Sequence, residues 1–211
     1  MFGLFKKRNK NKEDLQVVIG LMTSVFNLFS DEFEYIRMQV ADGLITGFQK
    51  KDTPFKNYTK FTYNSNVLNL YENSSGSFFS IKGIFVYDLQ TMQFVEIHVH
   101  IVYGMLLGYS IPAFNTILPD CDRITIESFQ IEYAENEDFL EIKPLLNDLE
   151  LQIVNPSNVY IVEIRDKVYY HILDLEDGDS IGIDKQKIVY KITHDPFDAI
   201  KLTEDLSVFL K

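Results

Sequence analysis

The sequence predicts an α+β protein built mainly from antiparallel strands. Apolar and polar residues alternate with a period of two through much of the chain after residue 35, which is typical of strands with one buried face. Helical patterns occur only near the two ends and once between them, an order that favours α+β over a doubly wound fold. With 211 residues and 46% hydrophobic content, the chain can bury a sizeable core. We expect a mostly antiparallel, strongly bent sheet with an N-terminal helix, a middle helix and a short C-terminal helix.

The N-terminal segment combines a basic tail with an amphipathic helix. The first twelve residues hold five Lys or Arg and no acid, and residues 15–29 are largely apolar. This apolar run contains polar residues, lacks a small-residue cleavage site and is too short to span a bilayer, so neither a signal peptide nor a membrane span is expected. We expect residues 1–14 to form a frayed basic tail. Weak contact of Phe2, Leu4, Phe5 and the neighbouring lysines with a membrane surface is an open alternative.

Several strands are expected between the N-terminal helix and residue 120. Residues 36–40 alternate toward Asp42-Gly43, a dipeptide typical of hairpin turns, and residues 44–48 return, which predicts a hairpin. Further strands are expected at residues 58–71, 78–87 and 94–103, the first two joined by a turn at residues 73–76.

The strand at residues 94–103 carries the best metal candidate. Its apolar residues point to one face, while Glu96, His98 and His100 point to the other. A carboxylate and two imidazoles on one face could converge on a single ion, so these three residues form a candidate metal or small-ligand site. Two imidazoles on the solvated face of an antiparallel strand are the commoner situation and stand as the alternative.

The second half of the chain continues the alternation of strands around one helix. The apolar phase of residues 123–133 shifts by one position, which predicts a bulge near Ser128. A helix over residues 135–150 must kink or restart at Pro144. Thr203 is a suitable N-cap for a terminal helix that ends at Leu210. Other strands are expected at residues 159–164 and 168–173, at a short segment near Ile181 and at residues 187–195.

The charge is distributed unevenly along the chain. The net charge is −11, with +5 on residues 1–12, −4 on residues 13–119 and −12 on residues 120–211. An acidic body repels a phosphate backbone, so nucleic acid is not an expected partner, whereas a basic protein is attracted. Solubility alone is the other explanation of the acidity. We divide the chain into the tail, an N-terminal region of residues 15–120 and a C-terminal region of residues 121–211, which either share one core or form two.

The sequence contains no recognised catalytic signature. It lacks a P-loop, a dinucleotide-binding glycine motif, a nucleophile elbow and a His-Glu-x-x-His zinc motif. Neither an enzymatic activity nor a cofactor is therefore expected, although an active site assembled from scattered residues stays open. The single cysteine, Cys121, excludes an internal disulfide and fits a reducing compartment, so we expect a cytoplasmic protein.

The acidic segment of residues 174–184 is centred on Gly178. A calcium loop of the EF-hand type needs a glycine at its sixth position and acidic residues at the first and third. Placing Gly178 sixth puts Leu173 and Leu175 at those two positions, so the calcium pattern fails. A tight hairpin turn with Gly178 at a positive φ is the better account.

Three features near the C-terminus carry a family resemblance. An acidic Gly178-Asp179 turn precedes a short strand, a second strand ends at His194-Asp195, and a small residue, Ala199, leads to a short helix ending in Phe-Leu. With this pattern, residues 159–210 resemble the C-terminal half of the SUKH superfamily, the Smi-and-Knr-like fold. Bacterial members are mostly immunity proteins that neutralise toxin domains, often nucleases, and fungal relatives regulate cell-wall synthesis through protein contacts. The resemblance therefore implies a protein-binding role without catalysis.

The leading hypothesis is a non-enzymatic, cytoplasmic protein-binding module, in the form of a bacterial immunity protein that neutralises a basic toxin domain. The alternative is a metal- or small-ligand-binding protein that uses Glu96, His98 and His100. In the leading hypothesis, the residues expected to meet the partner are those of the acidic turn: Asp174, Glu176, Asp177, Asp179 and Asp184.

Overall fold

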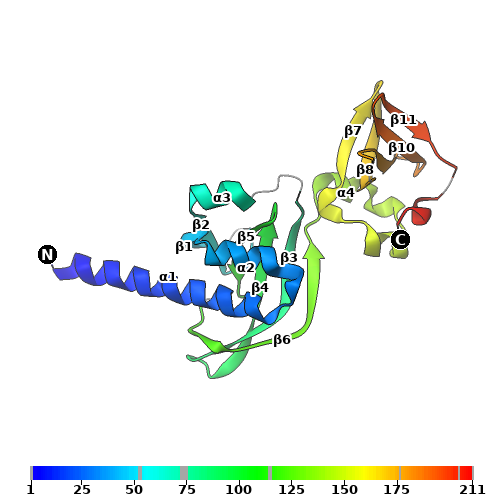
Figure 1. Cartoon of the computed structure of the whole chain (residues 1–211). Coiled ribbons are helices and arrows are strands. Elements are labelled where there is room, and N and C mark those ends of the chain that lie inside the picture. Colours follow the sequence, from blue (N-terminus) through cyan, green and yellow to red (C-terminus); the bar gives the residue numbers. More distant parts are fainter. Residues whose placement is uncertain are drawn as a thin grey trace. The chain divides into compact units, whose positions relative to one another are not determined.

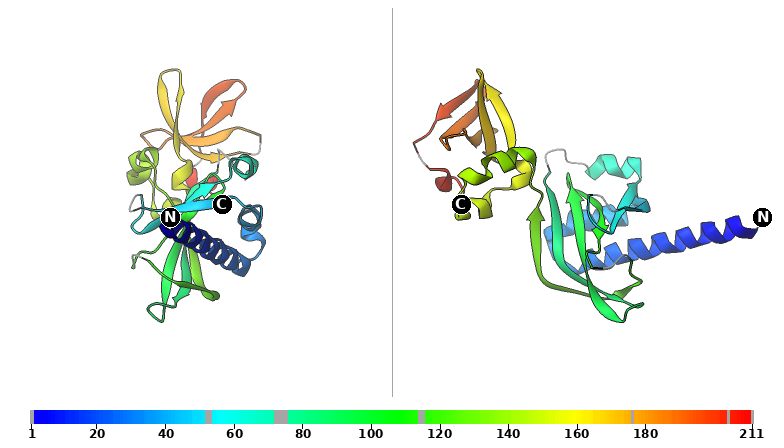
Figure 2. Two further views of the ribbon diagram at one scale, coloured as in Figure 1. Left: turned by 90° about the vertical axis from the view of Figure 1, so that its left-hand side faces the viewer. Right: turned by 180° about the vertical axis from the view of Figure 1, so that it is seen from behind.

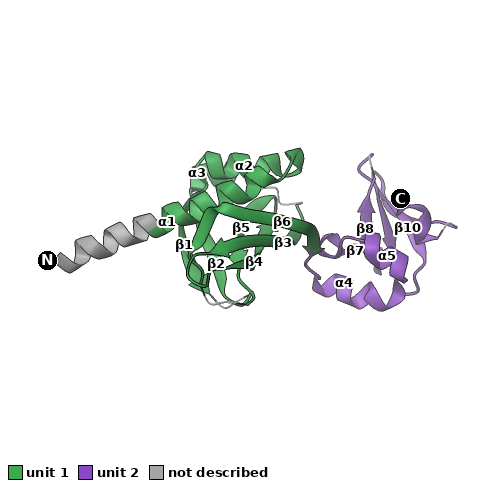
Figure 3. Ribbon diagram, turned by 90° about the horizontal axis from the view of Figure 1, so that it is seen from below, with its two compact units in different colours: residues 1–132 green, residues 133–211 purple. Residues whose placement is uncertain are grey.

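The computed structural model divides the chain into two compact units, unit 1 (Met1–Glu132) and unit 2 (Tyr133–Lys211) (Figure 3). It describes residues 2–51, 54–71, 76–113, 116–175, 177–203 and 205–210, and for residues 2–13 the backbone alone. The predicted membrane contact of Phe2, Leu4 and Phe5 and the turn at residues 73–75 therefore lie outside the described residues. Among the helices in the described ranges, none has both the length and the apolar composition needed to cross a bilayer.

Unit 1 contains a six-stranded sheet with the order β1-β2-β5-β4-β3-β6 (Figure 1). The pairs β1–β2, β2–β5, β5–β4 and β4–β3 are antiparallel, and α1 and α2 pack against each other across one face of the sheet (Figure 2). The elements are α1 (Phe2–Leu28), the 3-10 turn η1 (Asp31–Phe33), α2 (Glu34–Ala41), β1 (Ile45–Lys51), β2 (Tyr58–Tyr63), α3 (Ser65–Tyr71), β3 (Phe78–Asp88), β4 (Gln93–Val102), β5 (Met105–Ser110) and β6 (Pro119–Tyr133).

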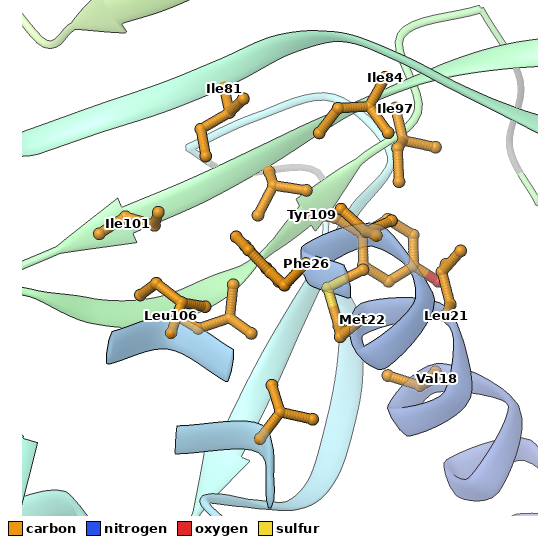
Figure 4. Packing of buried hydrophobic residues seen from close by; sticks show 14 of the residues in the cluster. Val18, Leu21, Met22, Phe26, Ile81, Ile84, Ile97, Ile101, Leu106 and Tyr109 are labelled. Atoms are coloured by element: carbon orange, nitrogen blue, oxygen red, sulfur yellow. The ribbon is translucent and has the colours of Figure 1, made fainter. Parts of the chain in front are cut away.

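The core of unit 1 lies between α1 and the sheet. Val18, Leu21, Met22 and Phe26 recur on α1 at intervals of three and four, which places them on one helix face. Figure 4 shows this face packed against apolar side chains of β3, β4 and β5, and all of them are buried. The labelled sheet residues are Ile81, Ile84, Ile97, Ile101, Leu106 and Tyr109.

The predicted hairpin at residues 36–48 is wrong in its first half. Residues 36–40 belong to α2, where Ile36 and Val40 are buried and Met38 is 51% exposed. A spacing of four residues fits both a strand and a helix face, and here the helix forms. Gly43 ends that helix with φ +77°, while the N–H groups of Gly43 and Leu44 donate to the carbonyls of Val40 and Gln39. This is a Schellman C-terminus rather than a hairpin turn.

The predicted strand at residues 58–71 is also too long. β2 ends at Tyr63, and α3 begins two residues later. The side chain of Asn64 accepts a hydrogen bond from the N–H of Asn66, and its carbonyl accepts one from Leu68. An asparagine in this role starts a helix, so the helix signal at Asn64 outweighs the alternating pattern.

Residues 123–133 form the predicted strand, and they pair in the sheet of unit 1. Ser128 has φ +51°, a left-handed backbone conformation at the position where the bulge is predicted. On the neighbouring strand, a Cβ added to Gly83 would lie 2.8 Å from the Glu127 carbonyl oxygen, so the two backbones approach closely there. Because β6 belongs to this sheet, residues 121–132 lie in unit 1, although the charge pattern groups them with the C-terminal region.

Unit 2 contains a five-stranded antiparallel sheet with the order β11-β10-β9-β8-β7. Its helical segment is broken at Pro144, as predicted, and restarts with Asn147 as the cap of a capping box with Glu150. The elements are α4 (Glu137–Ile142), the 3-10 turn η2 (Lys143–Leu145), α5 (Asp148–Ile153), the 3-10 turn η3 (Pro156–Asn158), β7 (Tyr160–Ile164), β8 (Lys167–Asp174), β9 (Ser180–Ile183), β10 (Val189–His194), β11 (Phe197–Lys201) and the 3-10 turn η4 (Leu206–Val208).

Two apolar clusters hold unit 2 together. The larger one packs α4, α5 and the C-terminal residues onto one sheet face, with Phe139, Tyr170 and Leu206 fully buried. The smaller one contains Tyr169 and Ile192. Tyr169 and Tyr170 are adjacent on β8 and therefore point to opposite faces. The larger clusters of the two units share no residue, and the α+β class is confirmed in both.

The predicted short C-terminal helix is present as the 3-10 helix η4, but it begins later than expected. Ala199 lies on β11 and pairs with Ile192 of β10, and only the short turn η4 follows, with Asp205 rather than Thr203 at its N-cap position. Without β11, the outer edge of β10 would leave its backbone groups unpaired. That demand comes from tertiary structure and outweighs the local helix signals.

Candidate functional site

Asp174 is the most exposed of the described residues of the acidic turn. It ends β8 and its side chain is 80% exposed. The ring of His171, only 2% exposed, donates a hydrogen bond from Nε2 to Asp174 Oδ1 at 2.9 Å. Residues three apart on a regular strand point to opposite faces, but the register of β8 against β9 shifts between His171 and Leu173. This bulge brings the imidazole and the carboxylate together.

His171 is held on its remaining sides by the strand next to it and by η3. Its Nδ1 lies 3.1 Å from the carbonyl oxygen of Asn158. The ring of Tyr160, on β7, stacks on the imidazole at 4.3 Å between centroids and an interplanar angle of 11°. Burial, and secondarily the charge of Asp174, raises the pKa of the Tyr160 hydroxyl. The hydrogen-bond distance to Asn158 and the stacking on Tyr160 set the orientation of the imidazole, and its hydrogen bond to Asp174 in turn positions that carboxylate.

The pair of His171 and Asp174 lies on a pocket of about 240 Å³. The pocket is formed by the end of α5, by η3, by the last half of β8 and by the C-terminal residues, all within unit 2. Its walls are mainly apolar, with polar groups at a few points, which is the usual composition of a ligand pocket. The lining residues are Ile153, Val154, Asn155, Asn158, His171, Ile172, Leu173, Asp174, Phe209 and Leu210.

Asp179 links the turn to strand β10 through its nearly buried side chain. Gly178 has φ +83°, which confirms the predicted tight turn. The nearly buried carboxylate of Asp179 accepts hydrogen bonds from Lys191 Nζ at 2.8 Å, from the ring Nδ1 of His194 at 2.8 Å and from the backbone N–H of His194 at 3.0 Å. Lys191, and then His194, hold the pKa of this carboxyl well below its usual range. The Gly-Asp turn and the end of β10 are thus fastened to each other.

The other predicted turn residues differ in their roles. Asp177 is exposed and forms an ion pair with Lys191 at 3.2 Å. Asp184 accepts hydrogen bonds from the N–H groups of Gln186 and Ile188 and from the hydroxyl of Tyr190, so it shapes the turn between β9 and β10. Glu176 lies outside the described residues. Of the predicted set, Asp174 and Asp177 are the described carboxylates exposed at the surface, and both oxygens of Asp177 have partners, the N–H of Asp179 and the ammonium group of Lys191.

In unit 1, Glu96 and His98 lie on one face of β4, as predicted, and contact each other. Glu96 Oε1 lies 3.4 Å from His98 Nε2 and accepts a hydrogen bond from the N–H of Gly83 at 3.0 Å. Partial burial lowers the pKa of His98, although Glu96 opposes this effect.

His100 lies on the same face, but its ring is sealed inside the structure. It is 1% exposed, with Nδ1 and Nε2 at 2.8 and 2.9 Å from the hydroxyls of Ser80 and Ser110. Phe55 stacks on the ring at 3.6 Å between centroids, and burial lowers the pKa of His100 to about 3. Throughout the described ranges, no three His, Cys, Asp or Glu residues are grouped so as to hold a metal ion. The geometry therefore gives the metal alternative no support.

Sequence reasoning missed His171 as a site residue because it stands alone in the sequence and its contact with Asp174 depends on the bulge. The chain matches no protein-family model, no curated protein and no solved structure.

Proposed function

We propose that the chain is a non-enzymatic, cytoplasmic protein-binding module whose unit 2 takes a basic protein partner. The SUKH-like immunity proteins, which neutralise toxin domains, are the class that this proposal fits best. The observation that carries it is the concentration of negative charge in unit 2. A reducing compartment agrees with the single free cysteine, Cys121.

The two units differ strongly in charge. Unit 2 holds 17 Asp or Glu against 8 Lys or Arg, a net charge of −9, while unit 1 holds 14 against 12, a net charge of −2. Many acids of unit 2 are exposed and form no ion pair with any described residue, among them Asp148, Glu163 and Asp166. A field of this sign attracts a basic surface, accelerates its association and repels the phosphates of nucleic acids.

The structure also refines which acids a test should change. Substitution of Asp179 or Asp184 by a basic residue would remove hydrogen bonds that shape unit 2. A loss of binding in such a variant could then come from a changed structure as well as from the changed charge. Asp148, Glu163 and Asp166 are exposed and their side chains contact no described residue through a hydrogen bond or ion pair. The triple variant Asp148→Asn, Glu163→Gln, Asp166→Asn is therefore the cleaner probe of the field.

The experiment begins with capture of the partner by the full chain at low ionic strength and reconstitution of the complex from purified components. We expect a stoichiometric complex with a basic protein, and an association rate that falls about tenfold in the triple variant at low salt and less at high salt. Expression of the partner alone should arrest growth, and coexpression of the chain should restore it.

The matched control removes the same amount of charge from unit 1. Glu32→Gln, Glu34→Gln and Asp122→Asn change three exposed acids there, so the total charge of the two variants is equal. Equal association rates for the two variants would contradict a role for the local field of unit 2. A partner whose toxicity is unchanged by coexpression would rule out the immunity role.

A further inference from the structure

The pocket of unit 2 is suited to an alkyl chain. Most of its wall is apolar, contributed by α5, β8 and the C-terminal residues, and Ile153 at its edge is 43% exposed. The entry of an alkyl chain displaces water from these apolar walls, which is favourable in free energy. The volume of about 240 Å³ is small, which fits one extended side chain better than a cofactor.

A single carboxylate lies at this pocket. Asp174 is the one Asp or Glu among the described residues that line it. Its Oδ1 is occupied by the Nε2–H of His171, while its Oδ2 accepts no hydrogen bond from the described part of the chain. Because the buried imidazole already holds the carboxylate in place, little side-chain entropy of Asp174 is lost when a cation binds Oδ2.

Apolar side chains continue from the pocket onto the surface. Leu149 and Ile153 are four residues apart on α5, so they share one helix face, and both are more than two-fifths exposed. Val208, on η4, is exposed as well, and η4 packs on α5. An apolar patch around a pocket with a charged group at its edge is the usual anatomy of a protein-binding hot spot.

We propose that this pocket anchors one lysine side chain of the basic partner, an inference that rests on the proposed function. The four methylene groups of the lysine pack on Ile153, Leu173 and Leu210, and its ammonium group donates to Asp174 Oδ2. Long cationic side chains bury their stems in this way while the charged head stays near water. The field of unit 2, with its net charge of −9, adds to the attraction.

The single available oxygen selects lysine over arginine. A guanidinium binds a carboxylate best through two parallel hydrogen bonds that use both oxygens, whereas an ammonium acts as a point charge and needs one. At Asp174, Oδ1 is taken by His171. Arginine would therefore enter the pocket with one of its two hydrogen bonds unmade.

The test uses the full chain, labelled with ¹⁵N, and the probe N-acetyl-lysine N-methylamide. We expect saturable amide shifts confined to residues 153–158 and 171–174, with a dissociation constant on the order of 1 mM, as is usual for so small a ligand. The same compound acetylated on Nε keeps the stem but loses the charge and should bind about tenfold more weakly. The arginine analogue should also bind more weakly than the lysine probe.

The matched variants are Asp174→Asn and Asp177→Asn, which remove the same charge at neighbouring positions. Asp174→Asn should abolish saturation, and Asp177→Asn should leave it within about twofold. Equal binding of the acetylated probe, preference for arginine, or indifference to Asp174→Asn would overturn the inference. If the lysine probe fails while a salt-sensitive complex with a basic partner still forms, the inference falls and the proposed function stands. If the probe binds with the expected selectivity but no basic partner is found, the lysine preference of the pocket stands and the proposed function falls.

Discussion

Two histidines, one in each unit, are equally buried and have similar immediate surroundings, but their hydrogen-bond partners differ in exposure to solvent. His100 and His171 are 1% and 2% exposed. Both lie on inner strands of their sheets, both have a hydrogen-bonding atom near each ring nitrogen, and both stack on an aromatic ring, from Phe55 or Tyr160. Judged by burial and hydrogen bonding alone, the two sites would be equivalent.

The difference lies in the solvent exposure of the side chains to which the two histidines are hydrogen-bonded. The partners of His100 are the hydroxyls of Ser80 and Ser110, which are themselves buried. The partner of His171 is Asp174, which is 80% exposed and lines a pocket. The contact of His171 with an exposed carboxylate on a pocket makes unit 2 the place of the candidate site, while the polar contacts of His100 serve the fold.

The largest expected effect concerns the acid sensitivity of unit 1. The pKa of His100 is about 3 in the folded chain, against about 6.5 in an unfolded one. Below about pH 6.5 the unfolded state therefore binds a proton that the folded state does not, and the stability of unit 1 falls as the pH falls. The loss should reach about 2–3 kcal/mol between about pH 7 and about pH 4.5.

Hydrogen exchange followed by mass spectrometry measures this loss on peptides from unit 1 alone, which matters because two units need not unfold together. His100→Gln keeps groups that can hydrogen-bond to the serines but does not titrate, so it should flatten the pH dependence. His98→Gln should leave most of it, because His98 is only partly buried. An unchanged pH dependence in His100→Gln would contradict the assignment.

The next effect concerns the contact between the Gly-Asp turn and β10. The pKa of Asp179 is lowered in the folded state, so its stabilising contribution is complete above the unfolded value of about 3.9 and is lost as the pH falls below it. At neutral pH, Asp179→Asn should lower the melting temperature of unit 2 by about 5 °C. The difference between the variant and the native chain should shrink as the pH falls below about 3.9 and should disappear only below the much lower pKa of the folded state.

Asp177→Asn is the matched control, because Asp177 also pairs with Lys191 but is exposed and does not contact His194. Its melting temperature should stay close to that of the native chain. Equal shifts for the two variants would mean that the turn is held by general charge rather than by the hydrogen bonds of Asp179.

The parts of the fold that follow from local sequence were predictable. The helix break at Pro144, the irregularity at Ser128 and the turn at Gly178 each depend on the backbone preferences of one or two residues. The segment at residues 36–40 was not, because Ile36 and Val40 satisfy the spacing of a strand and of a helix at once. β11 was missed because its existence depends on the unpaired edge of β10, a strand that precedes it.

The candidate site was predictable only in part. Asp174 could be named from the acidic composition of its turn, but its neighbour could not. The contact with His171 requires the bulge in β8, and the pocket requires residues from α5 and the C-terminus that are far apart in the sequence. Conversely, the period-two pattern placed Glu96, His98 and His100 on one strand face, but it could not show that Ser80, Ser110 and Phe55 surround the last of them.

The smallest expected effect is that of Asp174→Ala, and its comparison with Ser80→Ala is the sharpest test of the two histidines, because each substitution removes one partner of a buried ring. Ser80→Ala deletes a buried hydroxyl, so His100 Nδ1 is left without a partner in a place that water does not reach, at a cost of about 2 kcal/mol. Asp174→Ala deletes an exposed carboxylate, and water can take its place beside His171, so the loss in free energy of unfolding should be about 0.5 kcal/mol. Hydrogen exchange on peptides of β3 and β8 measures both. If Asp174→Ala proved as costly as Ser80→Ala, Asp174 would be part of the fold in the way that Ser80 is, and the pocket would lose its claim to be the more available site.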